Sequence, residues 1–341
     1  MAKKIAVIGG GAWGTALAAH AARLGHEVML WAREPDVVTD VNERHENRLF
    51  LDGVALPKTL RASAAPAEVL DGAEIVVLVP PSAFLRNVAA VMSEHIPKSA
   101  RIVIASKGID ERTLQLMTDV AADALEGRTA AELCALSGPS FAREVASGLP
   151  TDVVVASKSA EAAGQVADAL HSPFFRVYTS KDPIGVEVGG AMKNVLAIAA
   201  GACDGLGMGT NARAALVTRG LSEMARLGIA LGGDPLTFMG LSGVGDLILT
   251  STGALSRNRS LGLKVAEGIE PAKYLASQRT VAEGFLTARA AWRLAQKVGV
   301  DVPITEQVYH VLHEGRPLLD AMKMLLTRAQ KNELWGIEER V

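Results

Sequence analysis

Lys4-Ile5-Ala6-Val7-Ile8-Gly9-Gly10-Gly11-Ala12-Trp13-Gly14 begins as an apolar strand and continues into a glycine-rich turn. Gly9, Gly11 and Gly14 fit the pattern GxGxxG, and an alanine-rich helical stretch follows. In this context Gly9 permits a tight turn, Gly11 lets a pyrophosphate approach the backbone, and Gly14 lets the helix pack on the strand. A glycine-rich turn that binds nothing is the weaker interpretation, because strand, glycines and helix agree. The stretch therefore predicts a dinucleotide-binding strand–turn–helix.

Short apolar strands alternate with helical patterns through the first half of the chain. Continuously apolar strands separated by helices indicate a parallel sheet that is covered on both faces. We therefore expect an α/β fold with a Rossmann-type, mostly parallel sheet. The expected strands are Lys4–Ile8, His26–Trp31, Ile75–Pro80, Arg101–Ser106, Leu133–Leu136 and Asp152–Ala156, and the expected helices are Gly14–Leu24, Pro35–Asn42, Ser82–Glu94, Leu114–Leu125 and Ser159–Leu170.

After Ser180 the strand pattern stops and only long helical stretches follow. A chain of 341 residues is long enough for about two domains. We expect residues 1–180 to form an NAD(P)-binding Rossmann domain and residues 181–341 an all-helical substrate-binding and catalytic domain, with Gln330–Val341 as a loosely held tail. The expected helices are Val186–Cys203, Asn211–Leu231, Leu261–Glu267, Ala282–Val298, Ile304–Glu314 and Leu318–Thr327.

Composition excludes several classes of protein. Lys and Arg number 35 against 37 Asp and Glu, so the chain has no basic excess with which to bind nucleic acid. Its two cysteines, Cys134 and Cys203, lie far apart, which excludes a disulfide framework and favours a reducing compartment. No uncharged apolar stretch reaches 18 residues, so membrane insertion is not expected. We interpret the chain as a cytoplasmic protein.

A lone lysine in an apolar helical stretch is a candidate catalytic or ligand-binding residue. Lys193 is the only formal charge between Val188 and Cys203, and Gly189 and Gly190 precede it by one helical turn. Such a lysine must extend to water, pair with an acid or react. The glycines leave space beside the helix, which suits a small ligand.

Other polar residues follow the ends of predicted strands. Lys107 comes directly after the strand Arg101–Ser106, and ligands of open α/β sheets bind beyond the carboxyl ends of strands. Gly138-Pro139-Ser140 follows the next strand and offers free N–H groups and a capping hydroxyl, suited to an anion or a carbonyl. A capped loop without a ligand is the alternative interpretation of that stretch.

Two further candidates lie in the helical half. Asp246 is a single charge within Leu241–Leu249, and its alternative role is that of a helix cap. Ser256-Arg257-Asn258-Arg259-Ser260 collects hydrogen-bond donors with no acid nearby in the sequence. Because arginine binds phosphate in bidentate fashion, the cluster suits a phosphate monoester; a charged surface turn is its alternative interpretation.

Cofactor selectivity depends on Arg33, which lies 19 residues after Gly14. An acidic residue near this position binds the ribose hydroxyls of NAD, whereas a guanidinium suits the 2′-phosphate of NADP. Glu34 follows at once, so we expect NADP with NAD also accepted. An ordinary surface arginine is the alternative.

Together these segments resemble the bacterial type of NAD(P)-dependent sn-glycerol-3-phosphate dehydrogenases, from Lys4 to about Leu326. The matching motifs are Gly9–Gly14 with Trp13, Ala105-Ser106-Lys107-Gly108, Gly138-Pro139-Ser140-Phe141-Ala142, Glu187–Gly201 with Lys193, Gly243–Leu247 and Ser256-Arg257-Asn258. The resemblance implies reduction of dihydroxyacetone phosphate to sn-glycerol 3-phosphate, the backbone precursor of phospholipids. One departure is Ala12, where many members have serine.

The resemblance also implies residue roles. Lys193 would be the proton donor and acceptor. Substrate contacts would come from Lys107, Gly138, Ser140, Lys193, Asp246, Ser256, Arg257 and Asn258. Besides the three glycines, the cofactor would contact Ala12, Trp13, Arg33, Lys107, Ala142, Arg257, Val281 and Glu283.

Other functions remain open on the residues alone. One is a different Rossmann-plus-helical dehydrogenase that acts on a hydroxy or keto acid, and another is a catalytically silent NADP-binding regulator. No metal is expected, because the helical pair His310 and His313 lacks a third ligand. A homodimer is compatible with the sequence.

Overall fold

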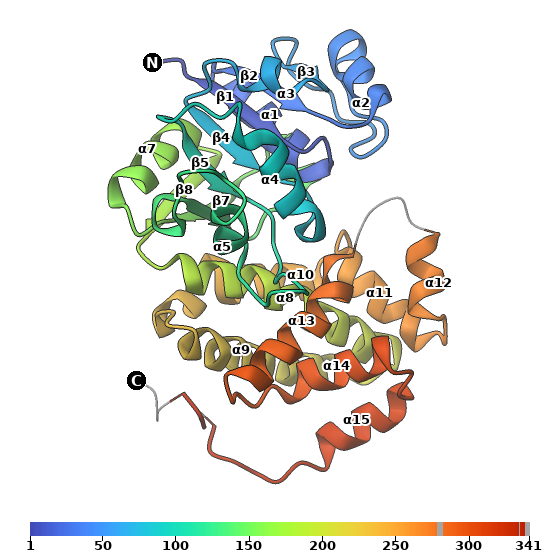
Figure 1. Ribbon diagram of the computed structural model, residues 1–341. Helices are drawn as coiled ribbons and strands as arrows, with labels where there is room; N and C mark the ends of the chain where they lie inside the picture. Colours follow the sequence, from blue (N-terminus) through green and yellow to red (C-terminus); the bar gives the residue numbers. More distant parts are fainter. Residues whose placement is uncertain (278–281, 334, 338–341) are drawn as a thin grey trace. The chain divides into compact units, whose positions relative to one another are not determined.

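The structure is a computed structural model that describes residues 1–277, 282–333 and 335–337. It divides into two compact units (Figure 1). The first comprises Met1–Ser106 and Met117–Pro183, and the second comprises Lys107–Leu116 and Ile184–Val341. The sequence predicts one boundary after residue 180. It gives no sign that a ten-residue segment inside the first half belongs to the helical unit.

The first unit is built on one eight-stranded sheet with the order β3-β2-β1-β4-β5-β6-β7-β8. Every neighbouring pair is parallel except β6 and β7. The expected mostly parallel sheet is thereby confirmed. The strands are β1 (Lys4–Ile8), β2 (Glu27–Trp31), β3 (Arg61–Ser63), β4 (Ile75–Leu78), β5 (Arg101–Ile104), β6 (Cys134–Ser137), β7 (Thr151–Ala156) and β8 (Phe175–Ser180).

Helices cover both faces of this sheet (Figure 1). Because side chains alternate along a strand, Ile5 and Val7 join an apolar core with α1, α6 and α7. Ala6 and Ile8 join a second core with α3, α4 and α5. The helices are α1 (Ala12–Arg23), α2 (Pro35–Thr39), α3 (Pro66–Leu70), α4 (Leu85–Ser93), α5 (Met117–Ala122), α6 (Ala142–Ala146) and α7 (Ala160–Leu170), with the short π-helix η1 (Asp40–Arg44) and the 3₁₀ helices η2 (Ser82–Phe84) and η3 (Ala130–Glu132).

Two strands of the sheet and the short helices α3 and α6 were not among the predicted elements, and one helix was misplaced. β3 has three residues, and β8 exposes Arg176 and Tyr178, so neither shows a continuous apolar run. The helix expected over Leu114–Leu125 does not begin until Met117. Leu114 instead has a positive φ of 62°, which breaks the helical pattern.

The second unit is helical, as expected. Its helix α8 (Pro183–Gly205) is long and apolar enough to cross a membrane, but its most apolar window is entirely buried, as in a core helix of a soluble protein. The helices α10 and α12 were not predicted. The remaining elements are α9 (Gly209–Ala230), η4 (Pro235–Met239), η5 (Leu241–Gly245), α10 (Asp246–Thr252), α11 (Arg257–Ala266), α12 (Pro271–Ala276), α13 (Glu283–Lys297), α14 (Pro303–His313) and α15 (Leu318–Leu326).

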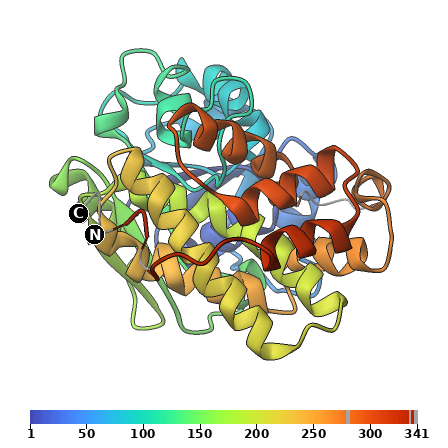
Figure 2. The ribbon, with the colours of Figure 1, turned by 90° about the horizontal axis from the view of Figure 1, so that it is seen from below.

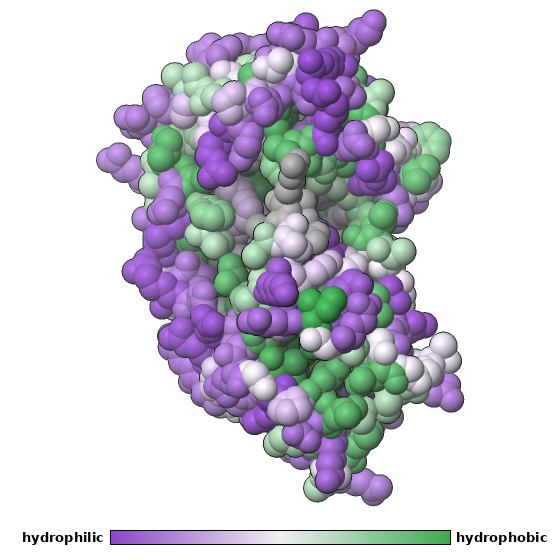
Figure 3. Space-filling view, turned by 90° about the vertical axis from the view of Figure 1, so that its right-hand side faces the viewer, coloured by the Kyte–Doolittle hydropathy of each residue, from purple (hydrophilic) through white to green (hydrophobic). Residues whose placement is uncertain are grey.

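The segment after α15 runs back across the helices of this unit (Figure 2). Arg219 of α9 donates a hydrogen bond to the carbonyl oxygen of Glu333 at 3.0 Å, and the guanidinium carbon of Arg226, on the same helix, lies 5.5 Å from the centre of the Trp335 ring. The described part of the tail is therefore attached to the unit, and the expectation of a loose tail is wrong for it. Hydrophobic side chains also gather on the surface of the helical unit (Figure 3).

Candidate functional site

The glycine-rich turn of the first unit has the geometry that its sequence indicates. Gly9 has a φ of +133°, and a Cβ there would stand 3.0 Å from the main chain of Val79. A Cβ on Gly14 would stand 2.0 Å from the carbonyl oxygen of Gly9, so only glycine lets α1 begin this close to the turn. Gly11 precedes α1 and faces open space, since a Cβ there would meet nothing within 4 Å.

This turn fits the anionic diphosphate of a dinucleotide. The first turn of α1 holds no acidic residue, and no side chain caps it. The positive end of the helix is therefore not neutralised by the chain itself. The indole Nε1 of Trp13 is a buried donor without a hydrogen-bond partner in the described structure.

The sequence did not indicate the residue that braces this turn. Asn47 is fully buried and donates from Nδ2 to the Gly10 carbonyl oxygen and to Thr15 Oγ1, both at 2.8 Å. Thr15 Oγ1 also donates to the Gly10 carbonyl oxygen at 3.2 Å. Asn47 lies in a polar stretch far along the chain, so no local pattern distinguishes it from a surface asparagine.

Arg33 lies just beyond β2, with 77% of its side chain exposed. Its Nη2 donates to Glu34 Oε1 at 2.9 Å. The two side chains that make cofactor selectivity ambiguous in the sequence thus form a pair at the surface. The guanidinium keeps further N–H donors with which to bind an anion.

Gly138 and Ser140 lie between β6 and α6. Gly138 has a φ of +129°, and a Cβ there would stand 2.9 Å from the Cα of Val153. Ser140 does not cap α6 as expected: its hydroxyl donates to the Gly138 carbonyl oxygen at 2.9 Å, while Phe141 precedes the helix without a side-chain cap. The hydroxyl stabilises the turn itself, and Ala142 opens the helix.

In the helical unit, one buried carboxylate binds two lysines. Asp246, at the start of α10, is 0% exposed. Lys193 of α8 donates to its Oδ1 at 2.5 Å, and Lys107 donates to its Oδ2 at 2.9 Å. Thr250 donates to Oδ1 at 3.2 Å. Asp246 is thus a partner of both lysines rather than a helix cap.

Close packing of main chains brings these groups together. A Cβ on Gly189 would stand 2.3 Å from the carbonyl oxygen of Ser242, so α8 and η5 meet backbone to backbone. Gly243 breaks the regular helix with φ −92° and ψ −105°, after which the chain enters α10 at Asp246. The space beside Gly189 is therefore filled by the segment that carries Asp246, not by a ligand as expected.

Burial and charge act in opposite directions on this cluster. Burial lowers the pKa of Lys193 to about 8, even though Asp246 acts to raise it, and the charge of Lys107 adds to the lowering. Burial alone would raise the pKa of Asp246, but the two lysines hold it below its usual value. The arrangement gives an ionised carboxylate beside a lysine that can exchange a proton near neutral pH.

The residues of the Ser256–Ser260 cluster have different surroundings in the structure. Ser256 caps α11 by accepting a hydrogen bond from Arg259 N at 3.2 Å. Arg259 is paired at 2.7 Å with Asp204, an acid that is distant in the sequence and that the local pattern did not indicate. Arg257, on the first turn of α11, is exposed. Arg257 is therefore the exposed guanidinium of this cluster.

Asn258 is buried, and its amide makes contacts within the protein. It donates to Asn194 Oδ1 at 2.8 Å and accepts from Gly284 N at 3.0 Å. Asn194, next to Lys193, was not predicted, although its position on the same apolar helix was a signal. Glu283 opens α13 beside Gly284. Val281, expected to contact the cofactor, lies outside the described residues.

The two histidines considered as a metal pair are otherwise engaged. His310 Nδ1 lies 2.5 Å from Glu314 Oε2, and His313 Nε2 donates to the Phe285 carbonyl oxygen at 2.8 Å. Within the described ranges, no three His, Cys, Asp or Glu side chains gather in a way that could hold a metal ion.

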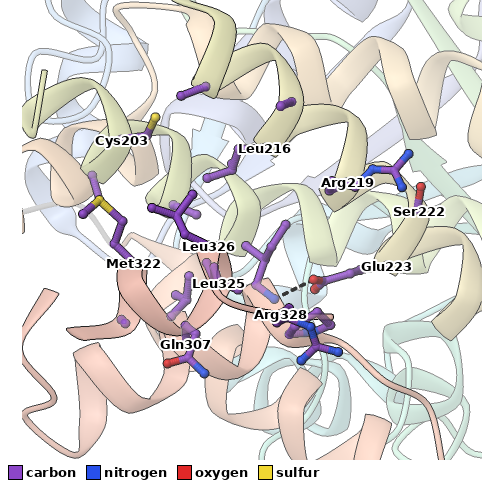
Figure 4. A pocket seen from close by; sticks show the side chains of 18 of the residues that line it. Cys203, Leu216, Arg219, Ser222, Glu223, Gln307, Met322, Leu325, Leu326 and Arg328 are labelled. Carbon is purple, nitrogen blue, oxygen red and sulfur yellow. Dashed lines mark hydrogen bonds between the residues drawn. The ribbon is translucent and has the colours of Figure 1, made fainter. Parts of the chain in front are cut away.

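A cavity of about 450 Å³ lies among α8, α9, α14 and α15, and no predicted site residue lines it (Figure 4). Its walls are mainly apolar. Glu223 accepts a hydrogen bond from Ile304 N at 2.5 Å, and burial raises its pKa to about 7. Arg328 pairs with Asp301 at 2.6 Å. These charged groups have partners within the protein, and the lysines and the aspartate of the buried cluster are not among the residues that line the cavity.

Comparison with known proteins agrees with this geometry. The family descriptions "NAD-dependent glycerol-3-phosphate dehydrogenase N-terminus" and "C-terminus" match residues 4–163 and 182–323. A relative from Geobacter metallireducens named "Glycerol-3-phosphate dehydrogenase [NAD(P)+]" is 50% identical over 98% of this chain and 99% of its own. The crystal structure of glycerol-3-phosphate dehydrogenase from Coxiella burnetii has a TM-score of 0.91 at 39% identity, covering 96% of this chain and 99% of that one. The chain therefore belongs to the NAD-dependent glycerol-3-phosphate dehydrogenase family.

Proposed function

We propose that this protein reduces dihydroxyacetone phosphate to sn-glycerol 3-phosphate with NAD(P)H, reversibly and in the cytoplasm, and so supplies the glycerol backbone for phospholipid synthesis. The observation that carries the proposal is the pair of lysines, Lys193 and Lys107, on the buried carboxylate of Asp246. Membership in the family supports the substrate, and the glycine-rich turn supports the cofactor.

The proposed chemistry begins with the carbonyl at C2 of the substrate. When bound, the nicotinamide supplies the hydride, and negative charge then develops on the carbonyl oxygen. The Lys193 ammonium stabilises that charge and donates the proton that completes the alcohol. With a pKa of about 8, the lysine can return to its protonated form near neutral pH. In the reverse direction the neutral amine accepts the proton.

Asp246 holds the proton donor in place. Its carboxylate stays ionised because two lysines face it, and its Oδ1 fixes the Lys193 ammonium at 2.5 Å. Lys107 adds a second positive charge beside the cluster, which favours a phosphorylated substrate. The exposed Arg257, on the first turn of α11, adds a guanidinium and a helix N-terminus for the phosphate.

The first unit supplies the residues proposed for the cofactor. Gly11 and the first turn of α1 would bind the diphosphate, and Trp13 Nε1 is a donor without a partner in the described structure. Arg33 would pair with the 2′-phosphate of NADP, so we propose NADP as the preferred cofactor with NAD also accepted. A homodimer remains a prediction.

The test is oxidation of NADPH and NADH, followed by nicotinamide absorbance. Dihydroxyacetone phosphate is compared with unphosphorylated dihydroxyacetone and with a series of 2-keto acids. Turnover specific to the phosphorylated ketone supports the proposal. Preference for a keto acid would assign a hydroxy-acid dehydrogenase, and cofactor binding without turnover of any of these substrates would assign a silent regulator.

A further inference from the structure

Lys107 reaches Asp246 from a segment that is inserted into the helical unit. The chain leaves the first unit after Ser106, contributes Lys107–Leu116 to the second, and returns at Met117. Ile109 and Leu116, which are 3% and 7% exposed, join the apolar core of the helical unit and pair with each other through a β-bridge. The two ends of the segment are therefore anchored by apolar side chains.

Between these anchors the segment is a tight, hydrogen-bonded turn. The side chain of Asp110 accepts hydrogen bonds from Thr113 N at 2.7 Å and from Arg112 N at 3.1 Å. Asp110 N donates to the Gln115 carbonyl oxygen at 3.0 Å, and Leu114 takes a positive φ of 62°. These hydrogen bonds tie the tip of the turn to Asp110, which lies three residues after Lys107.

Glu111 connects the tip of the turn to α13. Arg289 of α13 donates to Glu111 Oε1 at 2.6 Å, and Arg293 of the same helix donates to the Glu111 carbonyl oxygen at 2.9 Å. His313 orients Arg289: its Nε2 must carry the proton to bond the Phe285 carbonyl oxygen, so its Nδ1 accepts from Arg289 at 2.8 Å. α13 and α14 together thus hold the tip of the segment.

We propose that Glu111 is a positioning residue that, through Arg289 and Arg293, sets Lys107 at hydrogen-bond distance from Asp246. The inference rests on the proposed function, because Lys107 matters there as a substrate-site cation. Glu111 and Arg289 are 34% and 41% exposed, and ion pairs this exposed add little to stability. The consequence of losing the contact is therefore expected in substrate binding rather than in folding, since small displacements of a binding group are costly.

The test compares Glu111→Ala with a matched control, Glu314→Ala. Glu314 lies at the end of α14, pairs with His310 and is 48% exposed, so its removal takes away the same charge without releasing the segment. In Glu111→Ala we expect KM for dihydroxyacetone phosphate to rise about 10-fold, with kcat and the KM for NADPH changed less than 2-fold. The control is expected to keep wild-type constants, and both variants wild-type melting temperatures.

Two further readouts separate positioning from a general structural role. Lys107 lowers the pKa of Lys193, so its displacement should move the pH limb of kcat to higher pH in Glu111→Ala and not in Glu314→Ala. Reductive methylation of Lys107, followed by mass spectrometry, should be several-fold faster in Glu111→Ala. This labelling needs no turnover, so it distinguishes failure of the positioning role from failure of the proposed function.

Two results would overturn the inference. One is wild-type KM, pH profile and Lys107 labelling in Glu111→Ala. The other is a uniform loss, in which kcat, both KM values and the melting temperature worsen together. As an independent check, the charge-reversed pair Glu111→Arg with Arg289→Glu should recover part of the KM lost in Glu111→Arg alone.

Discussion

Gly189 of α8 lies so close to Ser242 that a Cβ would stand 2.3 Å from its carbonyl oxygen. Because the obstacle is main chain, it cannot rotate away, and Gly189→Ala must push η5 from α8. We expect this substitution to lower the free energy of unfolding by about 1–3 kcal/mol, as overpacking does. It should also raise KM for dihydroxyacetone phosphate, since η5 leads into Asp246. Chemical denaturation and steady-state kinetics measure the two effects.

Gly164→Ala is the matched control for this prediction. Gly164 lies within α7, where a Cβ would meet nothing within 4 Å. Alanine there should leave kinetics unchanged and stabilise the helix by roughly 0.5–1 kcal/mol. Equal effects of the two substitutions would show that the contact with Ser242 is not tight.

The pH dependence of the reaction should follow Lys193. Reduction needs the ammonium form, so its rate should be constant at lower pH and fall with a slope of one above about pH 8. Oxidation of glycerol 3-phosphate needs the neutral amine, so its rate should rise through the same range. Profiles of kcat in both directions from about pH 6 to pH 10 test this. A reductive rate that stays level to pH 10 would assign the proton to another group.

Substitution of Lys193 separates proton transfer from charge stabilisation. Lys193→Ala should lower kcat by about 10²- to 10⁴-fold while NADPH binding persists, because the glycine-rich turn is untouched. Lys193→Arg keeps the charge but cannot exchange protons near neutral pH, so it should be nearly as slow. Small primary amines should partly restore the alanine variant. An active arginine variant would indicate that the lysine acts through its charge alone.

Arg33 and Glu34 give a paired test of cofactor selectivity. Arg33→Asp should reduce kcat/KM for NADPH by roughly 10- to 150-fold, because one charge-assisted hydrogen bond to the 2′-phosphate is lost. The effect on kcat/KM for NADH should be much smaller. Glu34→Gln frees Arg33 from its 2.9 Å partner and should improve NADPH use by about 1.5- to 5-fold. Equal losses with both cofactors in Arg33→Asp would contradict the assignment.

Arg257 and Arg259 lie two residues apart but should behave differently. Arg257→Ala should raise KM for dihydroxyacetone phosphate at least 10-fold and hardly affect turnover of dihydroxyacetone, because only the phosphate contact is lost. Arg259→Ala breaks the pair with Asp204 and should mainly lower the melting temperature. If the two variants show the same losses, Arg257 serves the fold rather than the phosphate.

The features that local sequence patterns could predict are those that local interactions determine. The turn at Gly9–Gly14 follows from strand, glycine and helix signals that are adjacent in the chain. The isolation of Lys193 on an apolar helix was equally visible. By contrast, the Arg259–Asp204 pair and the brace from Asn47 depend on residues far apart in sequence. Strand β8 was not predicted, because it is an edge strand with exposed Arg176 and Tyr178 and lacks the continuous apolar pattern of its neighbours.

The inserted segment Lys107–Leu116 also means that this protein cannot be cut into its two units at a single peptide bond. A fragment ending at residue 183 would present Ile109 and Leu116 to water, and a fragment beginning at residue 184 would have gaps in its core where they belong. Chimaeras between relatives should therefore exchange the ten-residue insert together with the helical unit. A chimaera made with a single crossover would combine the insert of one parent with the α13 arginines of the other. Such a chimaera should be functional only where the insert and these arginines have changed together in the two parents.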